Sequence, residues 1–366
     1  MIGRWGYVNA LSEENKMAQG ISVIIPAYNR GTFIEECLKS VFNQTVQPDE
    51  IIVVDDGSKD NTPEIIKKLQ KQHPTLRYIH QPNAGSAVAR STGLLASNND
   101  IIAFLDSDDL WEPLHLEESL KALEIYPEAS FAFADFEVKS MHATLSEDFV
   151  KKYCARRGFV RQYLRLIERA TDDKYFLLNG EYLKHLILMR LDYIATSNLV
   201  FHRGRVNAHI FFDNALRIGQ DVDFILQYLK MGAQAVYIDS VHSIYVIHDK
   251  NIVMINEDEN KHFITLSEEK KLEIYTQSIE KRLMFCTQAD EFEVTFRWLA
   301  DYYWFIALGL NDNEQYAQAH LYFSLSYKFK KRFACLKHII IYALFGEKGK
   351  RFVMSLLRKI KKAPGH

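Results

Sequence analysis

The chain has 366 residues, which is long enough for two domains, and 48% of them are hydrophobic, which is enough to bury a core in each. Its formal net charge is only −2, but residues 328–366 hold twelve Lys and Arg against one acid. This tail has a balance of +11, which leaves −13 for the rest of the chain. This asymmetry suggests an acidic globular body with a basic tail, and we expect no nucleic-acid partner.

The termini and the cysteines give a first expectation about compartment. Residues 1–19 are polar and irregular and lack the apolar core of a signal peptide, so we interpret them as a flexible extension. No window reaches the 18 or so apolar residues of a membrane-spanning helix. The four cysteines are scattered without metal-ligand spacing, which favours reduced thiols in a cytoplasmic protein.

Apolar runs and helical patterns alternate at short intervals after residue 19. We predict strands at 21–29, 50–58, 76–81 and 100–109, and helices at 32–44, 61–72 and 86–97. This alternation predicts a parallel, doubly wound α/β unit over about the first 115 residues. Ligands of such sheets gather beyond the carboxyl ends of the strands. Five polar residues lie at predicted strand ends: Asn29, Asp55, Asp56, Asp106 and Asp108.

The pattern changes in the later part of the chain. We predict strands at 130–138 and 193–203, a helix with Phe224, Ile225, Tyr228 and Leu229 on one side, and two short strands within 235–251. From about Leu266 the periodicity is helical, with helices at 296–310, 313–329 and 333–346 and a basic amphipathic helix at 351–362.

Five segments, in order, carry a resemblance to a known family. They read VIIPAYN, VVDDGSKDNT, NAGSAVARSTGL, IAFLDSDDLWEP and FDNALRIGQDVDF, and each lies at a predicted strand end or helix start. Together they resemble the family 2 glycosyltransferases over residues 21 to about 250. The resemblance implies a GT-A type doubly wound, mixed, mostly parallel sheet with flanking helices, followed by an α-helical C-terminal region.

The resemblance also implies a domain plan and a reaction. Residues 20–250 would be the catalytic domain, with a nucleotide-sugar-binding half (20–115) and an acceptor-binding half (116–250), and residues 251–366 a helical domain. The implied reaction moves a sugar, with inversion, from a nucleotide-diphosphate sugar, expected to be UDP-linked, to a hydroxyl. The acceptor would be a glycan or a lipid-linked molecule of bacterial surface polysaccharide synthesis.

The acid cluster 106–109 is the expected metal and donor site. The resemblance makes Asp108 the ligand of Mn²⁺ or Mg²⁺, with His248 as a further ligand, and places Asp106 and Ser107 against the sugar-nucleotide. The alternative for His248 is a structural histidine on a strand. Asp109 precedes a predicted helix, so we interpret it as the start of that helix.

Other donor contacts follow from the same resemblance. Asp56 would accept a hydrogen bond from the nucleobase, with Tyr28 stacked nearby, while Asp55 either assists or only shapes the turn. Arg90 would face the donor diphosphate, or else form a surface ion pair. Further nucleotide-sugar contacts are expected at Pro26, Ala27 and Arg30.

The acceptor side rests on Asp221. By the resemblance, it occupies the position of the family's general base, the Asp of an E-D pair. A carboxylate within hydrogen-bond reach can take the acceptor proton as the new bond forms. Gln220 replaces the usual glutamate beside it, which removes negative charge and favours an ionised Asp221. Trp111 is a candidate floor for the acceptor site and equally a core aromatic.

The basic tail and two rival functions complete the sequence-based hypotheses. A basic amphipathic helix fits an anionic membrane surface, so we expect peripheral attachment at the inner face of the cytoplasmic membrane, with packing on the preceding helices as the alternative. A nucleotidyltransferase should show a glycine-rich basic loop near its start, and 26–33 has one glycine. A non-catalytic sugar-nucleotide-binding or scaffold protein remains a second alternative. A dehydrogenase is disfavoured because G-x-G-x-x-G is missing after the first strand.

Overall fold

The computed structural model describes residues 20–140, 144–146, 167–171, 174–189, 194–205, 210–248, 253–256, 261–264, 268–330 and 339. The chain divides into two compact units. Unit 1 contains Met1–Lys184, Asp192–Ala215 and Phe224–Asp249, and unit 2 contains His185–Leu191, Leu216–Asp223 and Lys250–His366. The predicted extension 1–19, the third C-terminal helix and the basic tail helix lie outside the described residues, apart from Ile339.

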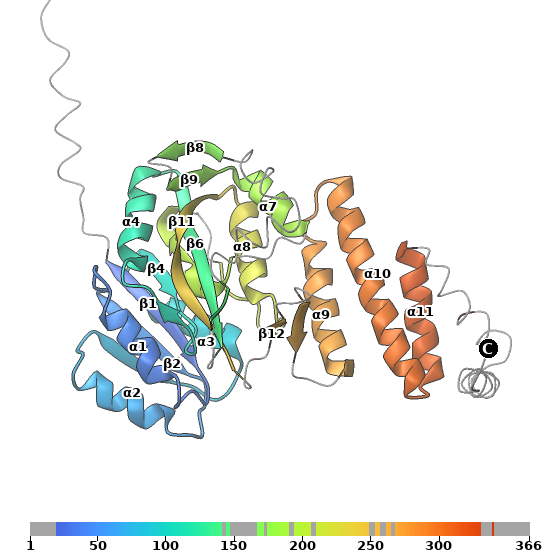
Figure 1. Cartoon of the computed structure of the whole chain (residues 1–366), viewed down its shortest axis with the longest axis horizontal. Coiled ribbons are helices and arrows are strands. Elements are labelled where there is room, and N and C mark those ends of the chain that lie inside the picture. Colours follow the sequence, from blue (N-terminus) through green and yellow to red (C-terminus); the bar gives the residue numbers. More distant parts are fainter. Residues whose placement is uncertain are drawn as a thin grey trace, which may run out of the picture. The chain divides into compact units, whose positions relative to one another are not determined.

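Unit 1 begins with the alternation that the sequence predicts (Figure 1). Its first elements are β1 (Ile21–Ala27), α1 (Ile34–Phe42), β2 (Glu50–Asp55), α2 (Thr62–Gln70), β3 (Leu76–His80), α3 (Ser86–Ala96) and β4 (Ile101–Phe104). Strand β1 pairs in parallel with both β2 and β4, and β2 pairs in parallel with β3. The strand order therefore reverses beside β1, and the carboxyl ends of β1 and β4 meet at this switch point.

The sheet continues with strands from later in the chain. These are β5 (Leu110–Trp111), β6 (Ala129–Ser140), β7 (Thr144–Ser146), β8 (Ile167–Thr171), β9 (Tyr175–Leu178), β10 (Val200–His202) and β11 (Gln234–Ile247). The order along the sheet is β3-β2-β1-β4-β10-β6-β11-β9-β8, with β5 on β11 and β7 on β6. Strand β10 runs antiparallel to β4 and β6, while β11 runs parallel to β6, so the predicted mixed, mostly parallel sheet is confirmed.

Helices cover both faces of the first half of the sheet. Inward-facing residues of α1, α2 and α4 (His115–Ile125) pack with Val23 and Ile25 of β1 in one core. Helix α3 lies on the opposite face, where Ala89 packs with Ile52 and Val54. The strands are buried on both faces, which is why they appear in the sequence as continuous apolar runs.

Three differences from the sequence-based expectations concern the second half of unit 1. The segment predicted as a strand at 193–203 contains a buried 3₁₀ turn, η1 (Thr196–Asn198), before the three residues of β10, and a second turn, η2 (Arg203–Arg205), follows. The two short strands predicted within 235–251 are one long strand, β11, with irregular register between Ile238 and Ser243. Asp109 does not start a helix, because α4 begins six residues later at His115.

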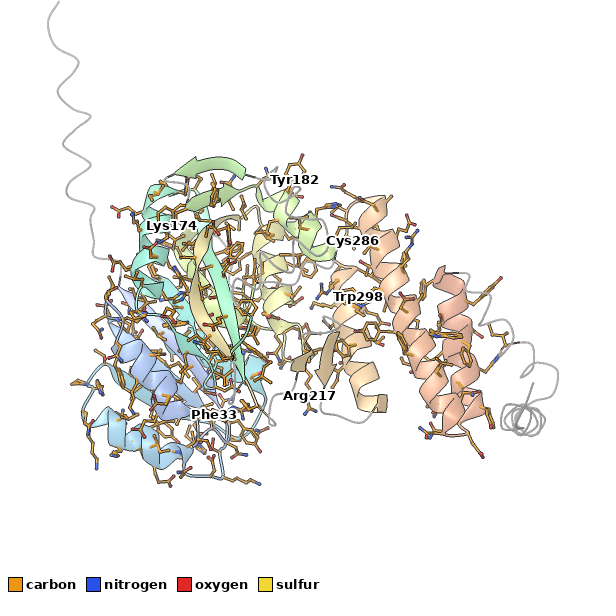
Figure 2. All side chains as sticks on the ribbon, in the orientation of Figure 1. Phe33, Lys174, Tyr182, Arg217, Cys286 and Trp298 are labelled. Atoms are coloured by element: carbon orange, nitrogen blue, oxygen red, sulfur yellow. The ribbon has the colours of Figure 1, made fainter. Side chains whose placement is uncertain are left out.

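Two helices each have residues in both units: α7 (Gly180–Leu188) and α8 (Gln220–Lys230). Unit 2 then has a strand pair, β12 (Val253–Asn256) with β13 (Lys261–Ile264), and α9 (Glu268–Arg282), α10 (Ala289–Asp312) and α11 (Tyr316–Lys330). Its core lies between the last three helices and includes Trp298, which is labelled in Figure 2. The Arg282 guanidinium lies 4.7 Å from the ring centre of Trp298. Helices α10 and α11 are the two that the sequence predicts at 296–310 and 313–329.

Candidate active site

The turn after β1 places the first side chains of the site. Asn29 has a left-handed backbone (φ 52°), and its side-chain oxygen accepts a hydrogen bond from Lys59 N at 2.8 Å. The backbone N–H of Arg30 donates to Thr62 Oγ1 at 2.8 Å. These contacts fix the turn against the loop after β2. Tyr28 is left 42% exposed, and its predicted stacking on a nucleobase stays a prediction.

The two aspartates at the end of β2 both accept hydrogen bonds from other groups of the protein. Asp55 is fully buried and accepts hydrogen bonds from Ser58 N and Tyr78 Oη. Burial raises the pKa of Asp55, but these hydrogen bonds outweigh it, and the pKa is lowered overall. The turn-shaping alternative for Asp55 therefore accounts for both of its oxygens.

Asp56 holds the loop that leads into α3. Its oxygens accept hydrogen bonds from the backbone N–H groups of Ala84 and Gly85 at 2.9 and 2.8 Å, and from Gln81. A nucleobase would have to share or replace these partners. The predicted base contact of Asp56 stays a prediction.

Asp106, at the end of β4, is paired with Arg90 of α3. Arg90 Nη2 lies 2.5 Å from Asp106 Oδ1, and the guanidinium lies 5.5 Å from the centre of the Phe212 ring. Arg90 is 7% exposed, so the surface ion pair expected as an alternative is not what the structure contains. The pair lies at the carboxyl edge of the sheet, where the sequence predicts the donor.

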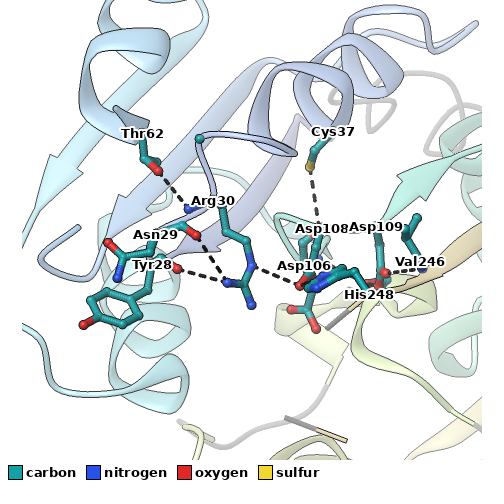
Figure 3. Close-up of polar contacts among 12 residues, drawn as sticks. Tyr28, Asn29, Arg30, Cys37, Thr62, Asp106, Asp108, Asp109, Val246 and His248 are labelled. Atoms are coloured by element: carbon teal, nitrogen blue, oxygen red, sulfur yellow. Dashed lines mark hydrogen bonds and ion pairs between the residues drawn. The ribbon is translucent and has the colours of Figure 1, made fainter. Parts of the chain in front are cut away.

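Asp108 lies between two side chains from distant segments, Arg30 and His248 (Figure 3). Its Oδ2 lies 3.0 Å from Arg30 Nε and 3.1 Å from His248 Nε2. Phe33 stacks on the His248 ring at 4.3 Å and holds it in place. Burial raises the pKa of Asp108, but the hydrogen bond with His248 and the charge of Arg30 outweigh it, so the pKa is lowered and the carboxylate is ionised at neutral pH.

Asp109 belongs to the interior. It is 3% exposed and accepts hydrogen bonds from Ser197 Oγ at 2.6 Å and Val246 N at 3.2 Å. Burial, together with the charges of Asp108 and Asp106, raises the pKa of Asp109 well above its usual value. The same Ser197 Oγ accepts a hydrogen bond from Asp106 N at 3.1 Å. Ser197 thus joins two members of the cluster.

Ser197 was not among the residues predicted from the sequence. It lies in the buried turn η1, within an apolar run that was predicted as a strand. The available signal was the polar triplet Thr196-Ser197-Asn198 inside that run, because buried polar groups need partners.

The arrangement fits a hard divalent cation with two protein ligands. Among the described residues, no group of three or more His, Cys, Asp and Glu side chains is placed to hold a metal ion. However, Asp108 Oδ2 and His248 Nε2 are 3.1 Å apart. Adjacent ligands of an octahedral ion at about 2.1 Å lie about 3.0 Å from each other. Asp108 and His248 therefore suit an ion that takes its other ligands from water and substrate oxygens.

The remaining candidates are placed as follows. Trp111 is 4% exposed and its indole N–H donates to Ser197 O at 2.7 Å, which favours the core alternative over an acceptor floor. Gln220 is buried, and its amide donates to Leu216 O at 2.7 Å. Asp221 lies in the first turn of α8, where its carboxylate accepts from Val222 N at 2.9 Å.

The other predicted nucleotide-sugar contacts lie near these groups. Pro26 and Ala27 end β1, and Ala27 O accepts from Asp56 N at 2.8 Å. Ser107 is buried between Asp106 and Asp108 in the chain. In unit 1, one edge of the sheet thus carries residues 28–30, Arg90, residues 106–108 and His248.

Comparison with solved structures concerns the fold. Staphylococcus aureus TarS residues 1–349, solved in complex with UDP-GlcNAc, superposes with a TM-score of 0.51 at 15% sequence identity over 93% of this chain and 92% of that one. At this identity the likeness concerns the fold alone, and the fold is that of a GT-A type glycosyltransferase with C-terminal helices.

Sequence comparison matches part of the chain to a family. Residues 22–172 match the model of glycosyl transferase family 2. The putative glycosyltransferase EpsH of Bacillus subtilis is 41% identical over 101 residues, or 28% of this chain and 29% of EpsH. The uncharacterized glycosyltransferase EpsJ of the same organism is 29% identical over 230 residues, or 62% of this chain and 60% of EpsJ.

A longer relative matches a similar share of the chain. Chondroitin synthase of Pasteurella multocida is 42% identical over 101 residues, which is 28% of this chain and 10% of that enzyme. The chain thus spans between 10% and 60% of the length of these three relatives. Residues 22–172 of this chain are thus similar to glycosyl transferase family 2.

Proposed function

We propose that this protein is an inverting glycosyltransferase that moves a sugar from a nucleotide-diphosphate sugar to an acceptor hydroxyl. The observation that carries the proposal is the cluster at the carboxyl edge of β1 and β4. There, Arg90 pairs with Asp106, and Asp108 faces both Arg30 and His248. The cluster lies mostly within the segment that matches the family model, residues 22–172.

The proposed donor is a UDP-sugar. TarS, which shares the fold, was solved with UDP and with UDP-GlcNAc. In our proposal Tyr28 stacks on the base, Asp56 accepts from it, and Asp106 contacts the ribose or donor sugar. Arg90 is already oriented by Asp106 and by the Phe212 ring, so it can donate to diphosphate oxygens at little cost in side-chain entropy.

The proposed chemistry is a single displacement. Mn²⁺ or Mg²⁺ on Asp108 and His248 would neutralise charge that develops on the departing diphosphate. Asp221 is the proposed general base that takes the proton of the acceptor hydroxyl. One base and one departing group on opposite sides of the anomeric carbon give inversion.

The proposed acceptor is a growing glycan or a lipid-linked precursor in surface polysaccharide synthesis. Among the relatives are the chondroitin synthase and the hyaluronan synthase of Pasteurella multocida, which are named for polysaccharide products. We propose that the basic tail brings the protein to the inner face of the cytoplasmic membrane, where such acceptors are found.

A donor panel tests the proposal. The full chain is mixed with UDP-, GDP- and dTDP-sugars, with and without Mn²⁺, and its thermal unfolding is recorded. We expect one UDP-sugar to raise the melting temperature in the presence of Mn²⁺, and Asp108→Ala to abolish that shift. Arg297→Ala, on the exposed face of α10, is the matched control. If the wild-type chain responds to no donor, with or without metal, the proposed function is wrong. If Asp221→Asn leaves transfer intact, the assigned base is wrong.

A further inference from the structure

The proposed cation ligand is already paired with a cation of the protein. Asp108 Oδ2 accepts from Arg30 Nε at 3.0 Å, and the same oxygen faces His248 Nε2 at 3.1 Å. Arg90 pairs with Asp106 in the same way. Two guanidinium groups therefore face the carboxylates of Asp106 and Asp108 at the carboxyl edge of the sheet.

Arg30 is held weakly by other groups and can be reached from solvent. Its Nη1 donates to Tyr28 O at 3.2 Å and to Asn29 O at 3.4 Å, both at the long end of the hydrogen-bond range. Its Nη2 makes no hydrogen bond within the part of the chain that the structure describes. The side chain is 18% exposed. Its backbone, by contrast, is fixed by Thr62, so the guanidinium can swing while the turn stays in place.

A divalent ion and the Arg30 guanidinium compete for one oxygen. An ion bound to Asp108 Oδ2 would place two positive charges next to each other at a mostly buried carboxylate, where repulsion is stronger than in open solvent. Arg30 must then leave Asp108. An anion next to the ion would both attract Arg30 and lower the repulsion, and the diphosphate of the donor is such an anion.

We propose that Arg30 is a latch that keeps the metal site closed until the donor diphosphate draws it away. Metal alone binds weakly, because it must displace the guanidinium. Metal and nucleotide diphosphate bind with positive coupling, because the diphosphate oxygens accept hydrogen bonds from the guanidinium that the metal displaces. By linkage each ligand strengthens the other by the same factor. The latch rests on the proposed function, since it takes Asp108 to be the metal ligand.

Mn²⁺ binding, measured by the electron paramagnetic resonance signal of free Mn²⁺, tests the latch without any turnover. The full-length wild-type chain, Arg30→Met and Arg30→Lys are titrated with and without UDP. We expect Arg30→Met to bind Mn²⁺ about tenfold tighter than wild type when UDP is absent, and the strengthening by UDP to fall by a similar factor. Arg30→Lys keeps the charge and is expected to remain close to wild type.

Two comparisons distinguish a latch from a purely structural role of Arg30 and from a general effect of lost charge. Arg297→Met removes the same charge from an exposed ion pair on α10 and is expected to leave Mn²⁺ affinity unchanged. If Arg30 only orders the site, Arg30→Met will bind Mn²⁺ equally or more weakly without UDP, and the latch is overturned. If wild type binds no Mn²⁺ even with UDP, the metal assignment of the proposed function fails, and the latch with it.

Discussion

At the scale of single residues, the three aspartates of the segment 106–109 have different surroundings. Asp106 pairs with Arg90, Asp108 faces Arg30 and His248, and Asp109 is buried against Ser197. The motif predicts a donor site at Asp106 and Asp108 because the pattern is local. The role of Asp109 was not predictable, since its partners lie 88 and 137 residues further along the chain.

Ser197 gives the residue-scale prediction. Its hydroxyl donates to Asp109 and accepts from Asp106 N, so we treat it as a positioning residue for the cluster. Ser197→Ala should weaken Mn²⁺ binding in the presence of UDP by roughly tenfold, because a hydrogen bond to a carboxyl group is lost. Ser197→Thr, which keeps the hydroxyl, should restore most of that affinity.

A second buried serine serves as the control for Ser197. Ser243 Oγ donates to Asn198 Oδ1 at 2.7 Å and makes no bond to the acid cluster among the described contacts. Ser243→Ala should lower the free energy of unfolding by about 1 kcal/mol and leave Mn²⁺ affinity unchanged. Equal loss of Mn²⁺ affinity in Ser197→Ala and Ser243→Ala would contradict the positioning role.

At the scale of elements, the strands and helices in the first half of unit 1 can be predicted from the sequence. Each strand is an apolar run, and each helix has apolar residues at helical spacing. The second half does not, since its pairings depend on contacts between distant segments. Strand β11 is the clearest case. Asp239 and Ser240 appear as a turn in the sequence, yet the strand continues past them with an irregular register against β6.

Two helical glycines test how closely the elements pack. A Cβ at Gly93 of α3 would lie 2.4 Å from Ile24 Cγ2 of β1, whereas a Cβ at Gly309 of α10 meets nothing within 4 Å. Gly93→Ala should therefore destabilise unit 1 by about 1–3 kcal/mol through overpacking. Gly309→Ala should stabilise its helix by about 0.5–1 kcal/mol. Chemical denaturation of both variants measures these changes, and effects of the same sign would contradict the packing described.

Two buried histidines, where α4 contacts β11, predict that the stability of the fold depends on pH. His115 is fully buried beside His242, and neither of its ring nitrogens has a hydrogen-bond partner among the described residues. Burial lowers the pKa of His115 well below its usual range and that of His242 to about 4. Because the unfolded chain takes up protons near pH 6.5 and the folded chain does not, stability is full above that pH and falls below it.

His115→Leu tests this dependence. Each histidine should cost about 2 kcal/mol of stability between pH 7.5 and pH 5. His115→Leu removes one of the two contributions, so its free energy of unfolding should fall about 2 kcal/mol less than that of wild type over this range. If the free energy of unfolding falls by the same amount in wild type and in His115→Leu between these two pH values, His115 titrates normally in the folded protein.

At the scale of the whole molecule, charge is the property that the sequence predicts and the described fold leaves untested. Residues 328–366 carry a balance of +11, and most of them lie outside the described residues. Within the described part of the chain, no helix is long and apolar enough to cross a membrane.

Deletion of residues 347–366 tests the tail. If the tail binds anionic lipid through its basic residues, the truncated protein should move from the membrane fraction to the supernatant of a cell lysate. The full-length protein should also leave the membrane at high salt, because surface charge attraction is screened. The same partition for the full-length and truncated proteins would contradict the membrane role.

The central claim is that this chain transfers sugar from a nucleotide-diphosphate donor with inversion. Proton NMR of the full-length protein with Mn²⁺ and an α-linked UDP-sugar follows the anomeric signals during slow transfer of the sugar to water. The account predicts that the β-anomer of the free sugar appears first, and that Asp108→Ala releases none. Release of the α-anomer first, or no release and no binding with any donor, would contradict it.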